Sequence, residues 1–183
     1  MDEGPKEQPF TNDHLKISRL LDRLLGGHVT RYHTRPEVGN NQSVAEHTWR
    51  AVVILHTLWP DISREALLYL LYHDVTEAEL GDLPATTKWK YHFLAEEYRK
   101  VETDYQKTLG IVNEITEREK HLCKMADMLE LVMHCHRQVR KGNTFAEKIY
   151  TNGIEFLRNN FKTDPNFGPV EQVILELEKY DNQ

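Results

Sequence analysis

Histidine and aspartate residues occur at three places in this 183-residue sequence in settings that favour metal coordination. His73 and Asp74 end a strongly apolar stretch, ALLYLLYHD, whose leucines predict burial on most sides. His47 lies one turn inside a predicted helix, in SVAEHTWRAV. Asp127 has apolar neighbours in CKMADMLELVM, and a buried carboxylate needs a cation or a metal as its partner. Two imidazoles and two carboxylates suit a divalent cation such as Mn²⁺, Co²⁺, Fe²⁺ or Mg²⁺, with Zn²⁺ also possible.

Each of these residues also has an ordinary structural explanation when it is taken singly. A His-Asp pair such as His73-Asp74 can simply reach solvent at a helix end. His47 can be an exposed residue of a first helical turn, and Asp127 can form a salt bridge with an arginine. The combination of the three places, from three different predicted helices, is what favours a metal site.

Further polar residues could serve a hydrolytic reaction at such a metal. Glu77 lies one turn beyond Asp74, on roughly the same side, and could act as a general acid or base. Arg31 and Lys88 could supply a local positive field for phosphate, although basic loop residues are often only solvated. Asp82 could accept a hydrogen bond from a sugar hydroxyl, and capping of its own turn is the competing explanation.

The cluster His134-Cys135-His136 offers a second group of potential ligands, but its members point around one predicted helix. We interpret it as the cationic C-terminal end of that helix, because arginines follow. Cys123 and Cys135 lie in the same helix, about 18 Å apart at the helical rise per residue, too far for a disulfide. Unpaired cysteines are typical of the reducing cytoplasm, which is the expected compartment.

The composition is that of a globular protein, with 39% hydrophobic and 28% charged residues. The formal net charge of −6 argues against a binder of nucleic-acid polymers, which needs a basic surplus. No apolar run approaches the roughly 20 residues that cross a bilayer, so no membrane partner is expected. The polar, acidic start does not resemble a targeting segment.

Apolar spacing and capping residues predict an all-α fold, a compact bundle of about six or seven helices. We expect a flexible lead-in over 1–10 and a single domain over 11–183. The amphipathic helices suggest a homodimer or a higher homo-oligomer. The helices are expected over about 11–25, 43–59, 61 or 63 to 74, 89–109, 116–141, 144–160 and 170–180.

Longer motifs around these residues resemble the HD phosphohydrolase superfamily, and within it the YfbR-like 5′-deoxynucleotidase branch. The matching stretches are Arg31-Tyr32, SVAEH, YHDVTE-x-x-x-GDLP-x-x-x-K and KMADMLE, within about 15–140. This resemblance implies an HD-domain helical bundle. The chain departs from the branch at Tyr32, where tryptophan is usual, and at Ala85-Thr86, where the branch reads Thr-Pro.

The resemblance also implies roles for individual residues. Glu77 and Asp82 are expected to be catalytic. The expected substrate-binding residues are Arg31, Tyr32, Asp82, Pro84 and Lys88. The expected metal ligands are His47, His73, Asp74 and Asp127.

The activity implied is metal-dependent hydrolysis of a small deoxynucleotide, most simply of a deoxyribonucleoside 5′-monophosphate to deoxynucleoside and phosphate. Small phage proteins that resemble this branch hydrolyse dATP to deoxyadenosine and triphosphate, which is the alternative. A non-catalytic nucleotide-binding HD domain is a third and weaker hypothesis.

Overall fold

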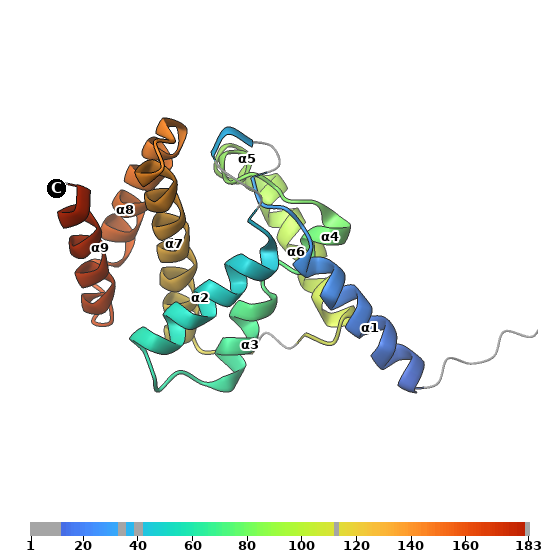
Figure 1. Ribbon diagram of the computed structural model, residues 1–183. Helices are drawn as coiled ribbons and strands as arrows, with labels where there is room; N and C mark the ends of the chain where they lie inside the picture. The colour runs from blue at the N-terminus through green and yellow to red at the C-terminus, as the bar shows by residue number, and fades with distance from the viewer. Residues whose placement is uncertain (1–11, 33–35, 39–41, 112–113, 182–183) are drawn as a thin grey trace, which may run out of the picture.

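The computed structural model describes residues 12–32, 36–38, 42–111 and 114–181, and within these ranges the chain is helical (Figure 1). Among the described residues there is no strand, only an isolated bridge between Thr30 and Ser43. The all-α prediction is confirmed. The expected lead-in over 1–10 lies outside the described residues, and the single domain over 11–183 stays a prediction.

Seven of the described helices have nine residues or more, which agrees with the expected number. They are α1 (Asn12–Gly27), α2 (Val44–Leu58), α3 (Arg64–Tyr72), α6 (His92–Thr108), α7 (Glu117–Arg140), α8 (Glu147–Phe161) and α9 (Gly168–Asp181). Two short helices lie between α3 and α6, namely α4 (Glu77–Leu80) and α5 (Ala85–Lys90). Two 3₁₀ turns cover Pro36–Val38 and Thr144–Ala146.

Local capping chemistry explains where the principal helices begin. Ser43 caps α2 by accepting a hydrogen bond from the Glu46 backbone N–H, and Ser63 caps α3 in the same manner. Thr116 and Glu119 form a reciprocal capping box at the start of α7. These beginnings were all predictable from sequence.

One predicted boundary was wrong. The expected helix over 89–109 is divided, because the backbone of Tyr91 leaves helical geometry between α5 and α6. Helix α1 ends at Gly27, two residues beyond the expected end at 25. Gly26 is there for packing, because a Cβ at this position would overlap the side chain and carbonyl oxygen of Val75.

Helix α7 is the central element of the core, and it packs against α2, α3, α8 and α9. Figure 1 shows α7 between α2 and α3 on one side and α8 and α9 on the other. Burial of these apolar side chains stabilises the fold by about 25 cal/mol per Å² removed from water. The fully buried apolar residues of α7 are Leu122, Met125, Ala126, Leu129, Val132 and Cys135.

Two arginines of α1 bind another part of the chain. Arg19 donates to the carbonyl oxygen of Thr108, and Arg23 donates to those of Leu109 and Gly110. These carbonyls belong to the C-terminal end of α6. The last carbonyl groups of a helix have no N–H partner within the helix, and positive charges are favoured there. The arginines therefore fasten α1 to the end of α6.

None of the helices in the described ranges is both long and apolar enough to cross a membrane.

The contact between Gly26 and Val75 leads to the first prediction. Gly26→Ala should lower the free energy of unfolding by about 1–3 kcal/mol, the usual cost of overpacking, because the methyl group meets backbone as well as side chain. Gly168→Ala is the matched control, since no atom lies near its Cβ position, and it should stay within about 0.5 kcal/mol. Urea unfolding measures both, and equal values for the two variants would contradict this account of Gly26.

Candidate metal centre

Three side chains from three helices meet at one point and could hold a metal ion. His47 comes from α2, His73 from the C-terminal cap of α3, and Asp127 from α7. One ligand atom from each lies within 4.8 Å of the others. Nε2 of His47 lies 3.2 Å from Oδ1 of Asp127, and Nε2 of His73 lies 3.8 Å from the same oxygen.

Asp74 faces the same point. Its Oδ1 lies 3.2 Å from Nε2 of His73, and its Oδ2 lies 3.8 Å from Nε2 of His47. The structure thus brings together all four residues that were expected to be metal ligands, and their role as ligands stays a prediction.

The second nitrogen of each imidazole is already engaged. Nδ1 of His73 lies 2.7 Å from the carbonyl oxygen of Leu70, which can only accept, so this nitrogen carries the proton. Nδ1 of His47 lies 2.7 Å from Oε2 of Glu130. Nε2 of His47 is buried and makes no hydrogen bond with the described residues. A metal ion binds an imidazole through an unprotonated nitrogen, and a buried nitrogen without a hydrogen-bond partner is available for this, so the donor set fits a divalent cation.

Lysine and arginine side chains pair with the outer oxygens of both carboxylates. Arg31 donates to Oδ2 of Asp74 over 2.7 Å, and Lys124 donates to Oδ2 of Asp127 over 2.8 Å. Burial alone would raise the pKa of each aspartate, but His73 and Arg31 lower that of Asp74. Lys124 and the two histidines likewise hold the pKa of Asp127 well below its ordinary value. Both carboxylates are therefore ionised at neutral pH.

The negative charges of Asp74 and Asp127 also change the pKa of the His73 imidazole that lies between them. Burial lowers the pKa of His73, but Asp74 and Asp127 outweigh it and raise this pKa well above the ordinary value. A proton on His73 thus competes with a cation for the same place, so cation binding must release it.

Glu77 begins α4, one turn beyond Asp74, and its carboxyl group differs from both aspartates. Burial, followed by the negative charges of Asp74 and Asp82, raises the pKa of Glu77 to about 8. A carboxyl group with this pKa holds a proton at neutral pH and can donate it.

The segment that carries Arg31 and Tyr32 is strained and firmly held. Tyr32 has a φ of 60°, a conformation that costs a non-glycine residue roughly 1–3 kcal/mol. Its ring stacks on that of His134 with centroids 5.3 Å apart, and the backbone N–H of Arg31 donates to the carbonyl oxygen of Gln42. Strain that is retained in this way is typical of functional segments.

The interpretation of His134-Cys135-His136 as part of a cationic helix end was wrong for these three residues, because all three side chains are buried. Burial lowers the pKa of His134 to about 4, so this imidazole is neutral. Arg137 and Arg140 do lie in the last turn of α7, whereas the ring of Tyr32 stacks on His134.

The remaining expected substrate residues lie on the segment between α4 and α6. Asp82 is half-buried, and Pro84 caps α5. The Tyr98 hydroxyl of α6 donates to the carbonyl oxygen of Gly81, which fixes the start of this segment.

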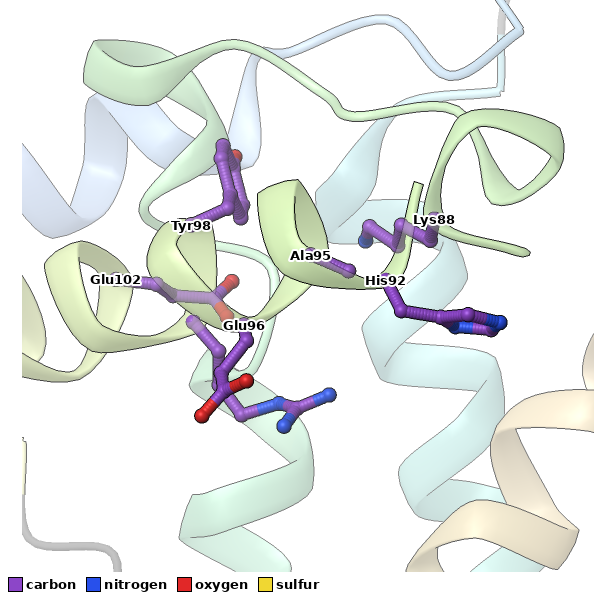
Figure 2. Close-up of a pocket in the computed structure, with 7 residues that line it drawn as sticks. Lys88, His92, Ala95, Glu96, Tyr98 and Glu102 are labelled. Carbon is purple, nitrogen blue, oxygen red and sulfur yellow. The ribbon is translucent and has the colours of Figure 1, made fainter. Parts of the chain in front are cut away.

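Lys88 lines a cavity of about 560 Å³ between α5 and α6 (Figure 2). The figure shows Tyr98 and Glu102 on the α6 wall of this cavity. The other lining residues are His92, Ala95, Glu96 and Arg99.

Three residues of this site were missed from sequence, namely Gln42, Lys124 and Glu130. Lys124 and Glu130 lie three residues before and after Asp127, so helical spacing places all three on one face of α7. That spacing was the available signal, but ordinary surface residues share it.

The sequence matches a known domain family and several curated 5′-deoxynucleotidases. The HD domain family matches residues 28–159. A 5′-deoxynucleotidase of Cronobacter sakazakii is 29% identical, with 56% of this chain and 63% of the relative covered. The 5′-deoxynucleotidase YfbR of Escherichia coli O1:K1 is 27% identical with the same coverage, so the chain spans less than two thirds of the length of these relatives.

Two solved structures share the fold. The cyanophage S-2L HD phosphohydrolase DatZ, bound to dA and one catalytic Zn²⁺ ion, has a TM-score of 0.68 at 18% identity, covering 87% of this chain and 96% of that chain. A Pyrococcus horikoshii protein has a TM-score of 0.65 at 18% identity, with 89% and 98% covered. Because the matched family covers most of the sequence and includes the four converging side chains, the chain belongs to the HD domain family.

Proposed function

We propose that this protein is a metal-dependent phosphohydrolase of deoxyribonucleotides, and most simply a 5′-deoxynucleotidase that releases phosphate from deoxyribonucleoside 5′-monophosphates. The observation that carries the proposal is the meeting of two imidazole nitrogens and two ionised carboxylates from three helices. The names of the curated relatives support the substrate class.

The proposed ligands of the cation are His47, His73, Asp74 and Asp127. Two nitrogens and two oxygens suit Mn²⁺, Co²⁺, Fe²⁺ or Mg²⁺, and the Zn²⁺ in DatZ makes zinc a further candidate. When bound, such an ion lowers the pKa of water and neutralises phosphoryl oxygens.

The protein residues then have separate roles. The guanidinium of Arg31, which Asp74 already orients, can bind a phosphate oxygen in fork geometry. Glu77 can hold a proton for the departing sugar oxygen, because its pKa is raised to about 8. Asp82 is proposed to support this step and to accept a hydrogen bond from the sugar. Tyr32 and Pro84 are proposed to border the nucleoside, and Lys88 the phosphate.

The alternative is hydrolysis of a deoxynucleoside triphosphate to nucleoside and triphosphate. A longer phosphate chain needs room and cations, and the cavity lined by Lys88 and Arg99 offers both. The name of DatZ as a phosphohydrolase bound to dA agrees with either reaction. A non-catalytic nucleotide-binding domain is less well supported, because all four proposed ligands and Glu77 are present together.

We further propose that the chain forms a homodimer or a higher homo-oligomer through α1. The arginines of this helix are used inside the chain, so its apolar side chains face outward. Their exposed fractions are 45% to 60%, and the residues are Leu15, Ile17, Leu20, Leu21, Leu24 and Leu25. An apolar stripe of this size on a helix is typical of a self-complementary interface.

The cytoplasm remains the proposed compartment, because both Cys123 and Cys135 are free and buried.

A product screen tests the main proposal. All four monophosphates and triphosphates are incubated with Mn²⁺, Co²⁺ or Mg²⁺, and the products are separated by chromatography. We expect phosphate from monophosphates, whereas triphosphate from a deoxynucleoside triphosphate would favour the alternative.

Metal dependence is tested by substitution of a proposed ligand. Asp127→Asn should lower both the rate and the metal content, the rate by more than about 100-fold, while the exposed Asp104→Asn should change neither. Activity that survives dialysis against a strong chelator would refute metal dependence.

The raised pKa of Glu77 gives the next prediction. Glu77→Ala should lower kcat about 10²–10⁴-fold with little change in metal content. Because the acid must be protonated, wild-type kcat/KM should fall as pH rises through the pKa of Glu77. This pKa is about 8 without metal and lower beside a bound cation. Glu79→Ala, on the same short helix, is the control. Loss of bound metal in Glu77→Ala would assign Glu77 to the coordination sphere instead.

The α1 interface is tested by charging its centre. Leu21→Lys with Leu25→Lys should remove about 3–6 kcal/mol of association free energy, which is a factor of ~10² or more in the dissociation constant. Analytical ultracentrifugation measures this change, and circular dichroism checks that the fold is kept. Leu175→Lys, an exposed leucine on α9, should leave association unchanged. A wild-type protein that stays monomeric at high concentration would refute the interface.

A further inference from the structure

Glu130 is the least expected residue around the metal centre. Its carboxylate is 1% exposed, in the middle of the core helix α7. Its Oε2 lies 2.7 Å from Nδ1 of His47, and its Oε1 accepts a hydrogen bond of 2.9 Å from Nε2 of Gln42. The guanidinium of Arg137 lies 3.7 Å from Oε1. A carboxylate this deep costs several kcal/mol in solvation, so its retention calls for a reason.

The contacts of Glu130 include one ion pair, with the guanidinium of Arg137 at 3.7 Å. Its two shorter hydrogen bonds go instead to the amide of Gln42 and the imidazole of His47. An ionised carboxylate can only accept hydrogen bonds. In the neutral imidazole of His47, Nδ1 must therefore carry the proton, which leaves a lone pair on Nε2.

The two histidines of the site are oriented by different means. His73 donates from Nδ1 to the backbone carbonyl of Leu70, which lies in its own helix and which no substitution removes. His47 instead depends on a side chain that lies 83 residues away in the sequence. Only the second arrangement can be tested by mutation.

Gln42 connects this pair to the segment that precedes α2. Its side chain donates to Glu130, and its backbone carbonyl accepts from the N–H of Arg31. One residue therefore contacts both the carboxylate behind His47 and the segment that carries the proposed phosphate-binding arginine.

We propose that Glu130, held by Gln42, is a positioning residue that fixes His47 as its Nδ1–H tautomer and directs Nε2 at the metal. The inference rests on the proposed metal site, and it assigns to Glu130 a function that acts through His47. Hydrogen bonds of this kind behind a metal-binding histidine are typically worth 10–100-fold in metal affinity.

The first experiment reads the tautomer directly in the metal-free protein. ¹⁵N NMR of the imidazoles separates protonated from unprotonated nitrogens without metal, substrate or activity. We expect wild-type His47 to be protonated at Nδ1 and unprotonated at Nε2. A proton on Nε2 together with an unprotonated Nδ1 would overturn the proposal, because Glu130 would then be a neutral donor to Nδ1 and would hold the imidazole in the form that cannot bind metal.

The second experiment compares three variants by calorimetric titration with Mn²⁺. Glu130→Leu removes the acceptor and should release the tautomer and weaken metal binding about 10–100-fold. Glu130→Gln should restore the Nδ1–H tautomer and most of the affinity. Its amide oxygen can accept from His47, while its NH₂ group can donate to the side-chain oxygen of Gln42, which has no hydrogen-bond partner among the described residues. Glu171→Gln, which removes a partly buried carboxylate paired with Arg158, should change neither readout.

The outcomes separate this proposal from the proposed function. If a folded Glu130→Leu variant keeps the wild-type metal affinity and the wild-type His47 tautomer, the positioning role of Glu130 is overturned. If the wild-type protein binds no divalent metal, both the positioning role and the proposed function are overturned. If Glu130→Leu fails to fold, Gln42→Leu takes its place, because it leaves the carboxylate in position and removes only its support. This variant should weaken Mn²⁺ binding several-fold, and unchanged binding together with an unchanged tautomer would count against the proposal.

Discussion

The site depends on the placement of two ionised carboxylates, Asp74 and Asp127, where there is little solvent. Like charges at this separation repel strongly where the dielectric is low, and each also loses its hydration. The protein offsets this by pairing one oxygen of each carboxylate with Arg31 or Lys124. The other oxygens are left facing His47 and His73, where a divalent cation would complete the neutralisation. The apolar packing of α2, α3 and α7 brings these groups together.

Helix α7 serves the core and the site at once, because its two faces have different sequences. Met125, Ala126, Leu129 and Val132 are buried in the core, while Lys124, Asp127 and Glu130 follow one another at intervals of three residues. That interval places successive side chains on one side of a helix. A core helix is the most rigid support available, so a ligand placed on it keeps its geometry better than one on a loop.

Much of this could be predicted from sequence, where the determinants are local. Ser43, Ser63 and Thr116 cap their helices through contacts within a few residues, and apolar periodicity predicted the long helices. Grouping His47 with Asp127 was possible because a buried charge demands a partner. The support from Glu130 was not predictable, since a glutamate in a helix is usually exposed and its partner is distant in sequence. The outward apolar face of α1 also depends on a tertiary contact, the binding of its arginines by the end of α6.

The strained backbone of Tyr32 shows how tightly the site is connected. A positive φ persists only when surrounding contacts outweigh its cost. Here the ring rests on His134 of α7, the neighbouring Arg31 pairs with Asp74, and the Arg31 backbone is bound by Gln42. Gln42 in turn holds the carboxylate behind His47. Because each contact fixes a group that another contact needs, the segment that carries Arg31 and the four proposed metal ligands form one unit, and displacement of any member would alter the geometry of the proposed metal site.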